Sequence, residues 1–135
     1  MTRVLYDTNV VLDVLLEREP FFTQSAAALN AAAGRVDGFL AAHAVTTIAY
    51  MLQRRFGTQR TREALARLLS RLTVAAVTDS TVRAALVSAT ADFEDAVCYH
   101  AALDAQVDVV VTRDPAGFAA NTIPTLAPGA FLATL

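Results

Sequence analysis

The chain has 135 residues, a formal net charge of −2 and a single cysteine. This length is typical of one domain, here residues 1–135, and a single cysteine excludes a disulfide within the chain. Although 55% of the residues are hydrophobic, no apolar run reaches the roughly 18 residues of a membrane helix, so we expect a cytoplasmic protein without a membrane segment.

Short apolar runs alternate with amphipathic segments along the whole chain. Strands are predicted at 4–6, 38–40, 74–77, 109–112 and 123–126. Helices are predicted at 9–16, 19–34, 46–56, 61–72, 82–89 (capped by Asp79 or Ser80), 92–106, 115–119 and 128–135, and Gly57 is expected to end one of them. This alternation predicts a parallel sheet with helices on both faces.

Two of the predicted strands run directly into a segment that contains an aspartate. Residues 4–6 lead to Asp7, and residues 109–111 lead, two residues on, to Asp114, while Asp95 stands at the start of a predicted helix. Ligands of open α/β sheets bind outside the carboxyl ends of the strands, so these acids are expected to share one crevice. Gathered carboxylates repel one another unless they share a cation or a proton. The pattern therefore indicates a divalent-metal site, and its oxygen ligands suit Mg²⁺ or Mn²⁺.

Each of these acids also has a purely structural alternative. Asp7 and Asp114 both precede helical segments and can serve as caps. Asp92 and Asp95 can cap a helix and complement its dipole, each contributing about 0.3–1 kcal/mol, and for Asp92 this is the favoured role. Neither of the two histidines has a partner that the sequence reveals, and we expect neither to be catalytic.

Taken together, these motifs resemble the PIN-domain nucleases, and within them the VapC-like toxins of bacterial toxin–antitoxin pairs. The matching segments are 5–13, 92–96 and 111–118, in this order. The resemblance implies a three-layer α/β/α sandwich around a mainly parallel sheet, and Mg²⁺- or Mn²⁺-dependent hydrolysis of phosphodiester bonds in RNA. It also implies a small antitoxin protein as a partner, and the apolar excess of the sequence leaves room for a homodimer interface.

The resemblance also assigns roles to individual residues. By the family's pattern Asp7, Asp95 and Asp114 would hold one or two metal ions, and Asn9 and Thr112 would support them through hydrogen bonds.

In one respect the sequence departs from the family's pattern. Many PIN nucleases carry a further acid, usually Glu, on the helix after the second strand, but residues 46–50 contain none. We hypothesise that Asp92 or Glu94 partly makes up for the missing charge.

An acidic crevice repels RNA, so a basic surface is needed elsewhere. Arg contacts to phosphates position a nucleic acid without reading its sequence. The candidates are Arg54, Arg55, Arg60 and Arg62, for which a solvated helix face is the alternative, and Arg113, which lies nearer to the acids and could touch the scissile phosphate.

Two other functions stay open at this stage. A phosphoaspartyl phosphatase of the haloacid-dehalogenase type also begins with a strand and an aspartate. In this chain, however, Asn9 stands where such a phosphatase has its second acid, and there is no lysine to bind the phosphate. The other alternative is a PIN fold that binds RNA or a partner without cutting RNA. The absence of an acid from residues 46–50 favours this alternative.

Overall fold

A sheet of five parallel strands, in the order β3-β2-β1-β4-β5, forms the centre of the computed structural model, which describes residues 1–118 and 122–135. Its strands are β1 (Arg3–Tyr6), β2 (Asp37–Ala41), β3 (Leu72–Ala75), β4 (Val109–Val111) and β5 (Thr125–Leu126). The strand order reverses at β1, because β2 and β3 lie on one side of it and β4 and β5 on the other. Such a switch point is where α/β sheets form their ligand sites.

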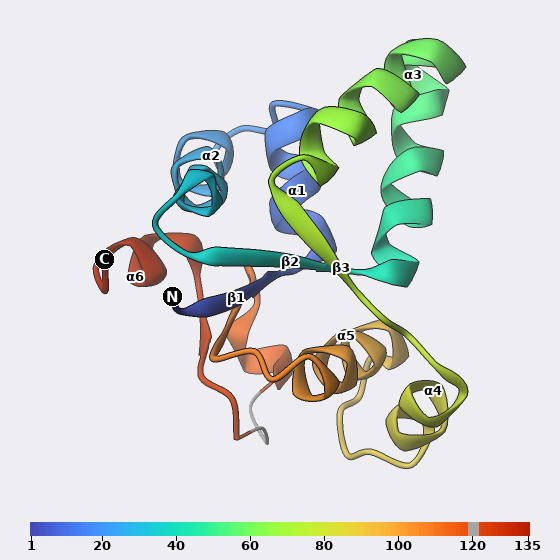
Figure 1. Cartoon of the computed structure of the whole chain (residues 1–135), viewed down its shortest axis with the longest axis vertical. Coiled ribbons are helices and arrows are strands. Elements are labelled where there is room, and N and C mark those ends of the chain that lie inside the picture. The colour runs from blue at the N-terminus through green and yellow to red at the C-terminus, as the bar shows by residue number, and fades with distance from the viewer. Residues whose placement is uncertain (119–121) are drawn as a thin grey trace.

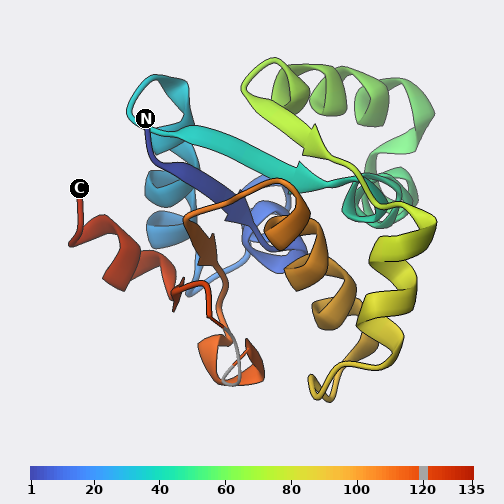
Figure 2. The same ribbon diagram turned by 60° about the horizontal axis from the view of Figure 1, so that its bottom comes forward.

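Helices cover both faces of the sheet, which confirms the predicted α/β/α architecture (Figure 1). The helices are α1 (Thr8–Leu15), α2 (Phe22–Asn30), α3 (Ala42–Leu69), α4 (Asp79–Leu86), α5 (Phe93–Asp104) and α6 (Pro128–Leu132), with the 3-10 turns η1 (Ala31–Ala33) and η2 (Pro115–Phe118). Figure 1 shows α1, α2 and α3 on one face and α4 and α5 on the other. Figure 2 shows α4 and α5 side by side, and α6 packs against α2.

The central strands are buried on both faces, which explains their uninterrupted apolar runs. Val4, Leu5 and Tyr6 of β1 are all 0% exposed. The Tyr6 hydroxyl donates a hydrogen bond of 2.8 Å to the carbonyl of Ala28 in α2, and its ring meets the Phe131 ring edge-on. The middle strand is thus fixed in position, and with it the residue that follows it.

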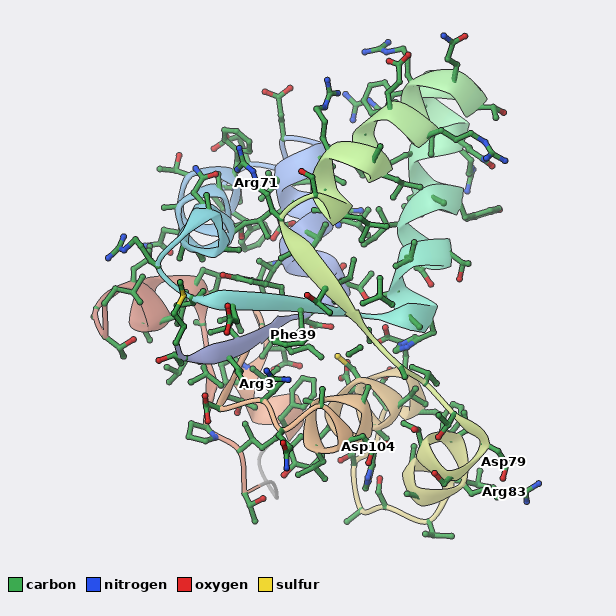
Figure 3. The ribbon with its side chains drawn as sticks, in the orientation of Figure 1. Arg3, Phe39, Arg71, Asp79, Arg83 and Asp104 are labelled. Atoms are coloured by element: carbon green, nitrogen blue, oxygen red, sulfur yellow. The ribbon has the colours of Figure 1, made fainter. Side chains whose placement is uncertain are left out.

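Polar contacts join the elements at two further places. The Arg3 guanidinium lies 4.5 Å from the centre of the Phe39 ring and donates a hydrogen bond to the Ala105 carbonyl, which joins β1, β2 and the end of α5 (Figure 3). The Thr81 hydroxyl donates a hydrogen bond of 2.7 Å to Asp104, which holds α4 against α5.

Several predicted boundaries are wrong. The second helix begins at Phe22, because Pro20 lies in a turn in which the Phe21 N–H donates to the Arg18 carbonyl. Leu72, predicted as the end of a helix, is the first residue of β3 and is buried by the sheet. The final helix ends at Leu132, three residues before the predicted end.

Two helix termini are set by local chemistry. The cap of α4 is Thr78, one residue before the predicted Asp79 or Ser80, because Thr78 and Thr81 form a reciprocal capping box; the helix ends at Leu86, short of the predicted 89. Gly57 does interrupt the helical backbone, as predicted, with φ 79° and ψ 174° inside α3. That conformation is open essentially to glycine alone.

The predicted turn at 115–119 is confirmed up to Phe118, and Ala119 lies outside the described residues. Within residues 1–118 and 122–135, no helix combines the length and the apolar character that a membrane crossing requires.

The hydrogen bond from Tyr6 to Ala28 can be tested by deleting one atom. In Tyr6→Phe the Ala28 carbonyl loses its side-chain donor but keeps the Ala31 N–H, so the free energy of unfolding is expected to fall by about 0.5–1.5 kcal/mol. Urea unfolding followed by circular dichroism measures the loss. The matched control is Tyr50→Phe, which deletes the same atom from a residue that is 61% exposed. Equal losses in both variants would contradict this role for the bond.

Candidate metal centre

Asp7 stands where β1 ends and α1 begins, and it is only 5% exposed. One carboxylate oxygen, Oδ1, accepts a hydrogen bond of 2.8 Å from the Thr8 N–H, so Asp7 does cap α1. The other oxygen, Oδ2, accepts a hydrogen bond of 2.8 Å from the hydroxyl of Thr112, which directly follows β4. The structural and the functional interpretations of Asp7 are therefore compatible, and the two donors fix the direction of its carboxylate.

The start of α5 brings two more acids to the same edge of the sheet. Asp92 caps this helix, its Oδ1 accepting a hydrogen bond of 2.9 Å from the Asp95 N–H, which confirms the role favoured from the sequence. Asp7, Glu94 and Asp95 each offer a carboxylate oxygen, and these oxygens lie within 4.8 Å of one another. An ion of the size of Mg²⁺ or Mn²⁺ fits such a set, and the ligands are all of the oxygen type that these ions prefer.

Asp114 approaches this group from the loop after β4. Its N–H donates a hydrogen bond of 3.2 Å to the Thr112 hydroxyl, which thus links Asp114 to Asp7. A Cβ added to Gly117 would lie 3.1 Å from an Asp114 oxygen and 3.3 Å from an Asp95 oxygen. Both carboxylates therefore lie beside Gly117, whose backbone has no side chain. Asp114 is exposed, and it does not belong to the group of three carboxylates formed by Asp7, Glu94 and Asp95.

These acids line one cavity of about 340 Å³ at the carboxyl edge of the sheet. Its lining consists of Asp7, Asn9, Asp92, Glu94, Asp95, Thr112, Arg113 and Asp114. The structure thus brings together every carboxylate that the sequence proposed as a metal ligand.

The electrostatics of the cavity favour a cation. Burial is the largest cause of the raised pKa of Asp95. Together with the nearby negative charges of Asp7, Asp92, Glu94 and Asp114 it raises this pKa to about 7. Burial also raises the pKa of Asp7, against the lowering effect of the Thr112 hydrogen bond. Carboxylates in this state gain stability when a proton or a divalent ion relieves their repulsion.

Two residues that contact the acids, Thr8 and His43, were not predicted from the sequence. Glu94 Oε1 accepts a hydrogen bond of 3.0 Å from the Thr8 hydroxyl and lies 3.2 Å from His43 Nε2. His43 therefore has a partner that the sequence did not reveal, and this contact is the largest cause of the lowered pKa of Glu94. The only local signal was that His43 lies two residues after the end of β2, and this does not identify Glu94 as its partner.

The remaining predicted residues lie farther from the acids. Asn9 is exposed on the cavity wall, and within the described part of the chain its side chain makes no hydrogen bond to a carboxylate. The Arg113 guanidinium lies over the Phe21 ring, 3.9 Å from its centre, and its Nε is 2.8 Å from the buried Asp13. Arg113 thus lines the cavity while its charge is paired behind the cavity wall.

The four predicted RNA-binding arginines of α3 are exposed and lie on either side of the bend at Gly57. In Figure 1 this helix begins beside α5 and leads away from it, so its bend lies far from the acidic cavity. The arginines are Arg54, Arg55, Arg60 and Arg62. The structure therefore does not bring them together with the carboxylates.

The PIN domain family matches residues 3–116, a segment that runs from β1 into η2 and includes every acid of the cavity. The chain belongs to the PIN domain family. This membership confirms the resemblance noted in the sequence and sets aside the phosphoaspartyl phosphatase. The comparison with curated proteins finds no match.

Solved structures share the fold of this PIN domain. A toxin–antitoxin complex from Klebsiella pneumoniae is 19% identical, with a TM-score of 0.71, covering 93% of this chain and 97% of that chain. The sarcin–ricin-loop-cleaving toxin VapC20 from Mycobacterium tuberculosis is 20% identical, with a TM-score of 0.68, and coverage is 87% and 95%. VapBC2 from Rickettsia felis, bound to a promoter DNA fragment, is 13% identical, with a TM-score of 0.64 and coverage of 91% and 96%. At these identities the likeness establishes a VapC-like fold.

The repulsion in the cavity predicts how the stability of the metal-free PIN domain depends on pH. Because the pKa of Asp95 rises from 3.8 to about 7 on folding, the folded protein holds a proton that the unfolded chain has already released within this range. The free energy of unfolding is therefore expected to fall as pH rises from about 4 to about 7. In Asp95→Asn this fall should be smaller, and the variant should melt at a higher temperature than the unchanged protein at pH 8.

Thermal unfolding in a chelator at pH 5 and pH 8 measures both effects. The control is Asp37→Asn, the same substitution at an exposed residue that begins β2, at the opposite edge of the sheet. If Asp95→Asn loses as much stability between the two pH values as the control does, Asp95 is not the source of the effect.

Proposed function

We propose that this PIN domain is a Mg²⁺- or Mn²⁺-dependent endoribonuclease and the toxin of a toxin–antitoxin pair, acting in the cytoplasm. The proposal rests chiefly on one observation, the convergence of the Asp7, Glu94 and Asp95 oxygens within 4.8 Å in an open cavity. Family membership supports the same activity, because the acids occupy the positions at which the resemblance expects catalytic residues.

Asp7, Glu94 and Asp95 would hold the metal, with Asp114 completing the acidic wall. A bound divalent ion activates water as a nucleophile and stabilises the charge that develops on phosphate oxygens. The protein residues have the task of fixing the geometry. Asp7 is the most rigid of them, because a backbone N–H and a threonine hydroxyl hold its two oxygens.

Asp114 and Asp95 differ in how deeply they lie in the cavity, which suits them to different tasks. Asp114 is exposed at the mouth of the cavity, and its backbone is tied to Thr112. Asp95 lies deeper, and burial together with the surrounding negative charges raises its pKa to about 7. We assign to Asp95 or Asp7 the orientation of the attacking water.

RNA must reach an acidic cavity, so positive groups are needed along its path. Arg113 lines the cavity, and we propose that the part of its guanidinium that Asp13 does not engage meets a phosphate near the cut. The exposed arginines at the bend of α3 would contact a more distant part of the strand: Arg54, Arg55, Arg60 and Arg62. Since such contacts act on the backbone, they would add affinity without sequence preference.

The proposed partners follow from the structural neighbours. The Klebsiella pneumoniae and Rickettsia felis neighbours are toxin–antitoxin complexes, and the Mycobacterium tuberculosis neighbour is a toxin that cleaves the sarcin–ricin loop. We therefore propose a small antitoxin protein as partner, a homodimer as the assembly and structured or single-stranded RNA as the substrate.

A PIN fold that binds RNA without cutting it is the second candidate. The observation in its favour is the start of α3, which presents His43 and two threonines and no acid. A cleavage assay on mixed RNAs with Mn²⁺ separates the two functions. Binding without cleavage would establish the second one.

The substitution Asp7→Asn is expected to abolish cleavage of RNA. The amide keeps the shape of the side chain but removes the charge from the most buried of the three acids. Cleavage is followed on a labelled RNA with Mn²⁺, and circular dichroism checks that the variant is folded. Asp37→Asn is again the control and should cut at the unchanged rate. A folded Asp7→Asn that still cuts RNA would refute the assignment.

The Thr112 hydroxyl is expected to act through Asp7 and Asp114. Thr112→Val keeps the shape but removes both hydrogen bonds, so Mn²⁺ affinity and cleavage should fall by roughly 10- to 100-fold. Thr112→Ser keeps the hydroxyl and should retain most of both. Mn²⁺ binding by calorimetry and the cleavage rate give the two readouts. If valine and serine variants behave alike, the hydroxyl has no such role.

A further inference from the structure

Three helices begin around the side chain of Glu94. Thr8 is the first residue of α1, His43 the second of α3 and Glu94 the second of α5. The helices α1 and α3 follow neighbouring parallel strands, so their first turns meet at the carboxyl edge of the sheet. The start of α5 reaches the same edge from the other face, where Asp7 and Asp95 also lie.

The direction of the hydrogen bonds at Glu94 follows from chemistry. An ionised carboxylate can only accept, so the Thr8 hydroxyl and His43 Nε2–H are both donors, over 3.0 and 3.2 Å. Both reach the same oxygen, Oε1. Two donors on one oxygen fix the carboxylate more firmly than either would alone.

The side chain of His43 has no other polar contact among the described residues. Its Nδ1 is buried without a hydrogen-bond partner, and its side chain is 25% exposed. The helix start is also a poor place for a residue chosen only to bear positive charge, because the dipole of α3 opposes it there. The side chain is therefore best explained by what it does to Glu94.

We propose that His43 and Thr8 are positioning residues that hold Glu94 as the third carboxylate of the metal centre. Glu94 then occupies, from α5, the role that the resemblance expected of an acid on the helix after the second strand, where this chain has His43 and the acid-free segment 46–50. The inference rests on the proposed function in so far as it takes the cavity to be a metal site.

The metal affinity of the intact chain tests the proposal without reference to catalysis. Mn²⁺ binding is measured by calorimetry on His43→Ala, His43→Gln and Glu94→Gln, with His100→Ala as the control at a histidine outside the cavity. His43→Ala should weaken binding by roughly 10- to 100-fold, as loss of a ligand's hydrogen-bond partner does. His43→Gln keeps an N–H donor and should restore most of the affinity. The metal-free melting temperature shows whether each variant is folded.

A double variant distinguishes positioning from direct metal binding. If His43 acts only through Glu94, adding His43→Ala to Glu94→Gln should weaken Mn²⁺ binding no further than Glu94→Gln alone. An additional loss in the double variant would make His43 a ligand in its own right and overturn the proposal. Unchanged affinity in His43→Ala would overturn it as well. Thr8→Val and Thr8→Ser give an independent pair, in which only the valine variant should lose affinity.

The outcomes separate this inference from the proposed function. If the unchanged chain binds Mn²⁺ and cuts RNA while His43→Ala binds equally well, only the positioning role fails. If the chain binds Mn²⁺ in the predicted order of variants but cuts no RNA, the proposed function fails and the positioning role stands. If the unchanged chain binds no Mn²⁺, both are refuted.

Discussion

Repulsion among carboxylates held at one edge of the sheet is the constraint on which the rest of the site depends. A parallel sheet gathers these groups, because β1 and β4 are neighbours and both end at the same edge. Asp7 and Asp114 therefore come close although they lie near opposite ends of the sequence. The fold must then supply donors that offset the repulsion while the cavity stays open to a cation.

Hydroxyl groups and helix starts supply those donors. The Thr112 hydroxyl accepts a hydrogen bond from the Asp114 N–H and donates one to the Asp7 carboxylate, so one side chain links two acids. The helices α1 and α5 begin at the cavity and direct their positive dipole ends toward it. None of these groups removes the negative charge, as the raised pKa of Asp95 shows. The site is stable enough to fold, and it still favours a cation.

The sequence revealed the acids because the signal was local. An apolar run that ends in an aspartate identifies both the strand and the residue at its tip, as at Asp7 and Asp114. The contact between His43 and Glu94 was not predictable in this way, because it joins two helix starts that only the strand order brings together. The same holds for Arg113, whose partner Asp13 is a buried residue of α1 and could be identified only from the packing.

The wrong helix ends have a related cause. The two predicted caps, Asp79 and Ser80, lie inside α4, because the reciprocal bond between Thr78 and Thr81 makes Thr78 the cap. Leu72 fits the apolar stripe of the preceding helix as well as it fits a strand, and pairing with β2 decides there. Local patterns therefore predicted the elements, and contacts between elements set their limits.

In the proposed metal centre the third carboxylate, Glu94, comes from the start of α5 and not from the helix after β2. An acid in the first turn of α5 gains from the dipole of that helix, and Asp92 already caps it, so Glu94 and Asp95 can both be accommodated there. The first turn of α3 is then free to hold a donor. A donor at this point is more useful than a further carboxylate, because the contact with His43 lowers the pKa of Glu94. An acid substituted for His43 would remove the donor and add a charge, so this chain should lose metal affinity, and not gain it, if it were given the acid that its family usually carries on this helix.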